Sequence, residues 1–177
     1  IMSLERDLDQ ILEVAVPADP SFRGIEQAAL DHSIRDARRY AREGAKEAFL
    51  LAVMHLMALP GNGHTRLIPN DAIRVLPLRF VSFGATVQLV SPAQNAPPRT
   101  AELIGVNGAP IHQIERAADK YLAGTRQRKR GIGPGLFAWP FALAHLGVPS
   151  ESGRTLYQVR AENGQISDLK ADHGHTV

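Results

Sequence analysis

The sequence predicts an α+β fold in which an N-terminal helical bundle, residues 1–60, precedes a small β-rich module, residues 61–177. Apolar residues recur at helical spacing through the first part, and after Gly63 their period changes from about 3.6 residues to about 2. Two Asn-Gly pairs, Asn107-Gly108 and Asn163-Gly164, are strong hairpin signals in the second part. Hydrophobic residues are 44% and charged residues 21% of the 177, which excludes wholesale disorder, collagen-like structure and a coiled coil.

Three helices are predicted in the first part. The first begins after Ser3, which suits an N-cap, and ends at Pro17. Asp19-Pro20-Ser21 opens the second helix by the same signals. The third spans about residues 45–59, is apolar on most sides and stops at Pro60-Gly61. Its apolar stretch is too short to cross a membrane, so it predicts a buried helix and no membrane span.

The second part predicts strands, one amphipathic helix and a closing hairpin. Alternating patterns predict strands at residues 65–68, 74–82, 85–90 and 100–106. The helix is expected at 111–122, followed by a glycine-rich basic loop at 124–135 and a short helix at 137–146 that Pro140 interrupts. The closing hairpin is expected to pair residues 155–161 with 165–170.

Charge and cysteine content narrow the function classes. The net charge is +2, and the positive excess lies mainly in the basic run 126–130. No aromatic residues interleave with these charges, which favours a solvated loop over a nucleic-acid site. There is no Cys, so disulfides, thiolate metal sites and a Cys nucleophile are excluded. The sequence predicts no cofactor.

His64 is a candidate for chemistry, and a structural role is the other interpretation of its spacing. It sits between a helix and a predicted strand, in Gly61-Asn62-Gly63-His64-Thr65, where glycines permit a tight turn. No Ser lies in a Gly-x-Ser-x-Gly motif or has a Lys four residues on, so no complete hydrolase centre is visible. His55 is expected to be a core histidine. His173 and His175 are expected to lie in a flexible tail, and a metal site built from them and His64 is a minor alternative.

Three segments resemble parts of the tail-specific (C-terminal processing) and tricorn-like serine peptidases. Residues 56–67, LMALPGNGHTRL, resemble the segment where an apolar helix ends in Asp-Gly-His-Thr, with Asn62 in place of the Asp. Residues 76–80, LPLRF, resemble the strand that follows. Residues 101–114, AELIGVNGAPIHQI, resemble a PDZ-type signature in which Ile-Asn-Gly-x-Pro-Ile precedes a helix. The resemblance covers about residues 25–160.

This resemblance implies an N-terminal helical domain, a PDZ-like module and a catalytic domain that lies outside this chain, beginning near residues 160–177. In tricorn-like members an N-terminal His is the base for a distant Ser, which makes His64 the matching position. In other members a Lys serves as base and the His is structural. The Asn at position 62 removes a carboxylate beside that His. We therefore expect a fragment that has no hydrolytic activity alone.

The PDZ resemblance implies that an unstructured peptide or a protein C-terminus binds by strand addition. The best candidate for the loop that receives the terminal carboxylate is Val81-Ser82-Phe83-Gly84, and a simple hairpin turn is the other interpretation. A stand-alone peptide-binding or adaptor module is the alternative to a peptidase fragment. Family members are mostly exported, which implies a periplasmic or extracellular location.

Overall fold

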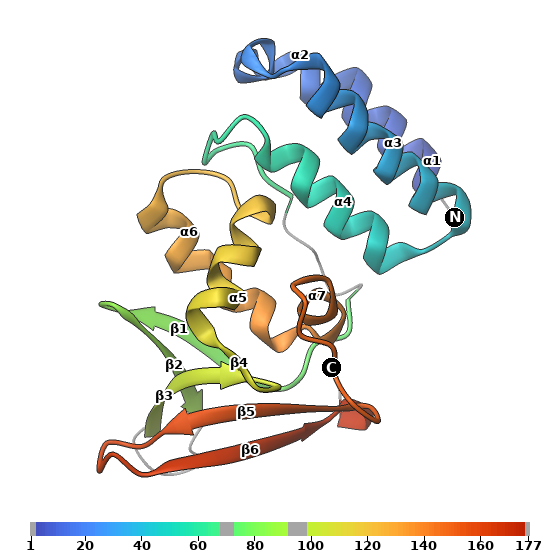
Figure 1. Cartoon of the computed structure of the whole chain (residues 1–177). Coiled ribbons are helices and arrows are strands. Elements are labelled where there is room, and N and C mark those ends of the chain that lie inside the picture. Colours follow the sequence, from blue (N-terminus) through green and yellow to red (C-terminus); the bar gives the residue numbers. More distant parts are fainter. Residues whose placement is uncertain (1–2, 68–72, 92–98, 176–177) are drawn as a thin grey trace. The chain divides into compact units, whose positions relative to one another are not determined.

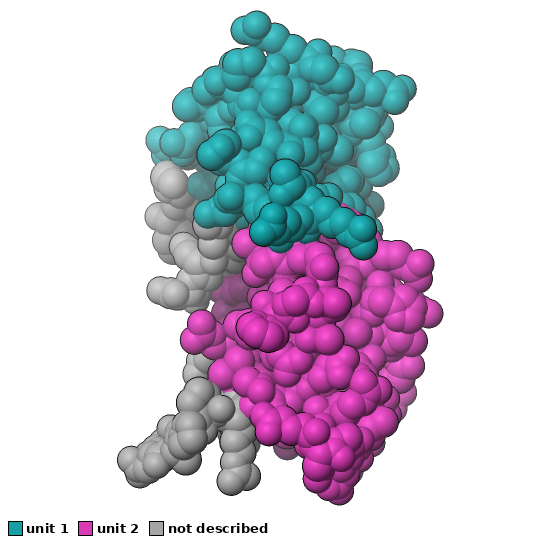
Figure 2. Space-filling view, turned by 90° about the vertical axis from the view of Figure 1, so that its left-hand side faces the viewer, with its two compact units in different colours: residues 1–70, 120–129 teal, residues 71–119, 130–177 magenta. Residues whose placement is uncertain are grey.

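The computed structural model describes residues 3–67, 73–91 and 99–175, and the chain forms two compact units (Figure 1). Unit 1 comprises residues 1–70 and 120–129, and unit 2 comprises residues 71–119 and 130–177, coloured separately in Figure 2. The α+β class, with an N-terminal helical part and a β module, is confirmed. The domain boundary at residue 60 stays a prediction.

Unit 1 is helical. Its first helix begins at Ser3, whose Oγ accepts a hydrogen bond from the Arg6 N–H at 3.3 Å. The helical elements are α1 (Leu4–Gln10), a π-helical stretch (Ile11–Ala15), α2 (Val16–Ala18), a 3-10 helix (Pro20–Gly24), α3 (Gln27–Glu43) and α4 (Lys46–Ala58). Two sequence predictions were wrong in detail. Pro17 lies inside α2, and Asp19 opens only the 3-10 helix, because Ser21 N–H bonds its side chain.

The core of unit 1 lies where α3 and α4 meet α1 and the 3-10 helix. Its buried residues come from all four elements: Leu8, Phe22, Ala37, Ala41, Phe49, Val53, Leu56 and Met57. Small alanines on α3 allow α4 to approach closely, and Val53 and Leu56 are completely buried. This core holds the C-terminal end of α4, from which the segment carrying His64 leaves.

Unit 2 is built on one antiparallel sheet. Its strands are β1 (Arg79–Phe83), β2 (Thr86–Ser91), β3 (Arg99–Val106), β4 (Ala109–Pro110), β5 (Arg154–Arg160) and β6 (Ile166–Asp172). The order is β1-β2-β3-β5-β6, with β4 paired to β3. Among the described strands, β1 and β6 are therefore the edges of the sheet.

Helical segments cover one face of the sheet. These are α5 (Ile111–Ala118), the 3-10 helix Gly133–Ala138 and α7 (Pro140–His145), with α5 and α7 on the same side in Figure 1. Alternate residues of β5 point to this side and are buried, including Tyr157, which is 0% exposed. The Tyr157 hydroxyl donates to the Phe137 carbonyl at 2.6 Å, which satisfies both buried polar groups.

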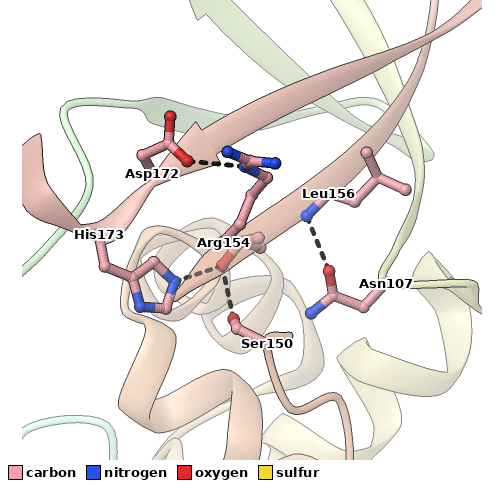
Figure 3. A network of polar contacts seen from close by, with 7 residues as sticks. Asn107, Ser150, Arg154, Leu156, Asp172 and His173 are labelled. Atoms are coloured by element: carbon pink, nitrogen blue, oxygen red, sulfur yellow. Dashed lines mark hydrogen bonds and ion pairs between the residues drawn. The ribbon is translucent and has the colours of Figure 1, made fainter. Parts of the chain in front are cut away.

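Asn107 explains the turn that follows β3. Its φ is 46° and that of Gly108 is 82°, which suits the paired positive angles of a type I′ turn. The Asn107 side chain accepts from the Leu156 N–H at 2.7 Å and donates to the Pro149 carbonyl at 2.9 Å. Figure 3 shows the bond to Leu156. The Asn-Gly pair thus shapes the turn and also joins β3 to β5.

Several predicted elements differ from the structure. Residues 65–67 form no strand, and residue 68 lies outside the described residues. The strand predicted from 74 begins only at Arg79, and the helix expected to reach 122 ends at Ala118, with a 3-10 turn at Asp119–Tyr121. The loop predicted at 124–135 was wrong, since it contains α6 (Arg126–Ile132) and the first half of the 3-10 helix Gly133–Ala138, where Gly133 and Pro134 are buried.

Candidate functional site

The segment that follows α4 is held by a single carboxylate, that of Asp19. Asn62 Nδ2 donates to Asp19 Oδ2 at 3.3 Å, and the Thr65 hydroxyl donates to the same oxygen. Asn62 Nδ2 also donates to Thr65 Oγ1 at 3.3 Å. The two residues that flank Gly63-His64 are thus bonded to each other and to a side chain more than 40 positions earlier in the chain.

His64 sits between these two bonded residues. Its backbone N–H donates to Asn62 Oδ1 at 3.0 Å, while the residue itself is exposed. Within residues 3–67, 73–91 and 99–175, no hydrogen bond or ion pair engages its imidazole. The loop therefore fixes the backbone of His64 while the residue stays exposed.

Asp19 is ionised in this arrangement. Its pKa is lowered to about 2, first by the hydrogen bond from the Ser21 side chain and then by that from Thr65. Ser21 donates twice to Asp19 Oδ1, from its hydroxyl at 2.5 Å and from its backbone N–H at 2.9 Å. A carboxylate that accepts several hydrogen bonds keeps its charge and strengthens each of them.

A second contact tightens the same loop. The Gly124 N–H donates to the Gly61 carbonyl at 3.1 Å, so segment 122–128 of unit 1 lies against residues 61–63. A Cβ on Gly63 would come within 2.8 Å of Arg128 Cδ, and one on Gly124 would come within 3.1 Å of the Gly63 Cα. Because Gly124 also has φ +103°, glycine is required there by both conformation and space.

The predicted peptide-binding residues 81–84 belong to unit 2, whereas His64 belongs to unit 1. Val81, Ser82 and Phe83 end strand β1, and Gly84 begins the turn into β2 with φ 57°. Phe83 is 78% exposed, more than any other large hydrophobic side chain in the part of the chain that the structure describes.

Arg130 braces this hairpin tip. Its guanidinium Nη2 donates to the Gly84 carbonyl at 2.8 Å, and its own carbonyl accepts from the Ser82 hydroxyl. The tip therefore combines an exposed aromatic ring with a fixed positive charge. No local sequence pattern predicts this contact, since 46 positions separate Arg130 from Gly84.

Two other histidines, His55 and His173, contact neighbouring side chains. His55 is half-buried, with Nδ1 3.5 Å from Ser33 Oγ and its ring at an edge contact with Tyr121. His173 lies at the end of β6, where Nε2 is 3.0 Å from the Thr155 hydroxyl (Figure 3), so it is ordered by a contact that the sequence did not predict.

The side chain of His175 lies outside the described residues. Among the described residues, no group of three or more His, Cys, Asp or Glu side chains could hold a metal ion. In the same part of the chain, every helix is too short or too polar to span a bilayer.

Comparisons with models of known protein families and with curated proteins find no match. Solved structures of CPAF, a chlamydial serine protease, do match. Mature CPAF aligns with a TM-score of 0.57 at 18% identity, over 95% of this chain and 33% of that chain. Its complex with lactacystin aligns with a TM-score of 0.58 at 18% identity, over 96% and 34%. A serine-to-alanine mutant gives 0.51 at 18% identity, over 95% and 33%.

These alignments show a related fold. Nearly all of this chain takes part, and it spans about a third of the length of the CPAF chains that it matches. The likeness therefore includes both the helical part and the β module.

Proposed function

We propose that this chain is the N-terminal and PDZ-like peptide-binding portion of a serine peptidase of the tail-specific kind. The nucleophilic Ser would lie on a catalytic domain outside these residues. The observation that carries the proposal is the exposed imidazole of His64 on a loop held at both ends, in a chain whose fold is related to a third of a serine protease. The resemblance of residues 56–67 to the Asp-Gly-His-Thr segment supports the same assignment.

In this proposal His64 is the general base. A Ser hydroxyl is a weak nucleophile until a base accepts its proton during attack on the scissile carbonyl. His64 is suited to this role because neutral imidazole is a base at physiological pH and its ring has no competing partner among the described residues. The catalytic domain would supply the Ser, its oxyanion hole and the group that orients the ring.

The sheet would supply peptide binding. Strand β1 is an edge of the described sheet, and an extended peptide can add to such an edge through main-chain hydrogen bonds. Residues 81–84 end this strand, where Phe83 offers apolar surface and Arg130 a positive charge for a C-terminal carboxylate. A stand-alone peptide-binding or adaptor module is the second candidate, favoured by the same edge and independent of His64.

The first test is the native protein, detected in its source with an antibody raised against this chain. We expect a band well above 19.3 kDa in a periplasmic or extracellular fraction. His64→Ala in that native protein should abolish peptide cleavage, with His112→Ala as the control for loss of a histidine elsewhere. A band at 19.3 kDa would favour the stand-alone module, and unchanged cleavage by His64→Ala would reject the base assignment.

The second test addresses the peptide. Labelled unstructured peptides with free and amidated C-termini are titrated against the chain by fluorescence anisotropy. We expect tighter binding of the free terminus, weakened by Phe83→Ala and by Arg130→Gln. Arg160→Gln is the matched control, because Arg160 pairs with Glu102 on another strand at 2.9 Å. If neither peptide saturates the protein, peptide binding by this surface is excluded.

A further inference from the structure

Asp19 bonds the two residues that flank Gly63-His64 through one of its oxygens. Oδ2 accepts from Asn62 Nδ2 and from the Thr65 hydroxyl, whereas Oδ1 accepts only from Ser21 among the described residues. The two oxygens thus have different partners. One closes the local turn at residues 19–21, and the other reaches the segment after α4.

The same contacts control the backbone of His64. Asn62 is oriented by donating to Asp19, and its Oδ1 then accepts the His64 N–H at 3.0 Å. Loss of the Asp19 carboxylate would leave Asn62 and Thr65 with hydrogen bonds inside residues 62–65 and without their link to position 19. The backbone of His64 would then be free to adopt other turns, because Gly61 and Gly63 impose few conformational limits.

The charge of Asp19 strengthens this link. Hydrogen bonds to an ionised acceptor are shorter and stronger than those to a neutral one. The hydrogen bonds that lower the pKa of Asp19 to about 2 keep it ionised through the pH range in which a histidine can act as a base. Protonation of Asp19 therefore does not interrupt the contact under working conditions.

We propose that Asp19 is the positioning residue for His64, acting through Asn62 and Thr65 to hold the backbone at His64 in one conformation, from which its exposed side chain reacts. The catalytic part of this inference rests on the proposed function. The link between Asp19 and the His64 loop concerns this chain alone. Asp19 lies before α3 in the sequence, and in this proposal it contributes to the chemistry of His64 in the loop after α4.

The first test distinguishes the contacts of Asp19 Oδ2 from those of Asp19 Oδ1. Asp19→Ala removes both, and we expect the amide of His64 to exchange with solvent about tenfold faster, with α4 amides unchanged. Ser21→Ala is the matched control, because it removes only a donor to Oδ1 and leaves the contacts to Asn62 and Thr65. It should leave exchange at His64 unchanged. Equal exchange at His64 in the wild type and Asp19→Ala would overturn the inference.

A second set of variants tests the hydrogen bond between positions 19 and 62 by exchanging its donor and its acceptor. Asn62→Asp places two carboxylates against each other and should loosen the loop. The double variant Asp19→Asn with Asn62→Asp reverses donor and acceptor, leaves an acceptor at position 62 for the His64 N–H, and should restore slow exchange. Failure of the double variant to recover, with circular dichroism showing a folded chain, would contradict a direct link between positions 19 and 62.

Catalysis gives an independent readout in the native protein. Asp19→Ala should lower kcat for peptide cleavage about tenfold with KM little changed, and the double variant should recover most of kcat. If His64→Ala leaves cleavage intact, the base assignment of His64 fails, while amide exchange still decides whether Asp19 holds the loop. If His64→Ala abolishes cleavage and Asp19→Ala changes neither kcat nor exchange, only the positioning role is overturned.

Discussion

At the scale of single residues, His55 shows how burial determines the role of a histidine. It lies on α4, close to Ser33 on α3 and Tyr121, and burial lowers its pKa, with the positive charge of Lys120 contributing next. His64, only nine positions on, is exposed and its ring is unengaged among the described residues. Two histidines of one unit thus have different surroundings, one half-buried against neighbouring side chains and the other exposed.

The lowered pKa of His55 makes a prediction about pH. The unfolded chain takes up a proton at His55 near pH 6.5, whereas the folded chain resists protonation until lower pH. The folded state should therefore be most stable above that pH and lose stability as the pH falls from about 7.5 to about 5. Urea unfolding followed by circular dichroism measures this loss.

His55→Gln should remove part of the pH dependence, because position 55 then no longer binds a proton. His64→Gln is the control, since His64 belongs to the same unit but is exposed. It should retain the wild-type slope of unfolding free energy against pH. A His55→Gln protein with the full wild-type slope would show that burial of this ring does not govern acid stability.

At the scale of elements, the sequence predicted best where the signal was local. The turn at Asn107-Gly108 and the hairpin of β5 and β6 depend on residues within a few positions, and both were found. The strand predicted at 65–68 was wrong over its described residues, because Thr65 bonds a carboxylate 46 positions earlier instead of entering a sheet. The loop predicted at 124–135 was wrong because tertiary packing, which buries Gly133 and Pro134, overrides the turn-like composition of this segment.

The residues of the candidate site also fall into two groups: those that a local sequence pattern predicts, and those that only tertiary packing brings together. The flanking glycines and the family resemblance made His64 a candidate from the sequence, and its role as a base stays a prediction. Asp19 was interpreted only as a helix start, because its contacts to Asn62 and Thr65 arise when distant segments pack together. Arg130 at the tip of the β1–β2 hairpin was missed for the same reason.

Residues 122–128 pack on the loop that carries His64, and Gly124 in this segment makes a prediction about stability. Gly124→Ala should destabilise the protein by about 1–3 kcal/mol, because alanine disfavours its φ of +103° and its Cβ would press on the Gly63 backbone. Gly131→Ala in α6 is the matched control, since nothing lies within 4 Å of a Cβ there. It should leave stability unchanged or raise it by up to about 1 kcal/mol. Thermal unfolding of both variants measures these changes in stability. Equal melting temperatures of Gly124→Ala and Gly131→Ala would contradict the packing argument.

At the scale of the whole molecule, each unit has its own buried core. Unit 1 buries the cluster around Leu56, and unit 2 buries the sheet face around Leu103 and Tyr157. The chain passes between the units more than once, because residues 120–129 of unit 1 interrupt unit 2 in the sequence. A related fold at 18% identity to CPAF is consistent with this organisation, since apolar patterning can persist while individual residues change.

Two leucines that are both 0% exposed test whether these cores are independent. Leu56→Ala and Leu103→Ala should each cost about 2–5 kcal/mol, because each leaves a cavity in a packed core. Amide exchange read residue by residue should accelerate in unit 1 for Leu56→Ala and in unit 2 for Leu103→Ala. Residues 122–128 should follow Leu56→Ala, although unit 2 flanks them in the sequence. If either substitution accelerates exchange equally in both units, the chain unfolds as one cooperative body, and the loop of His64 takes its stability from the whole chain.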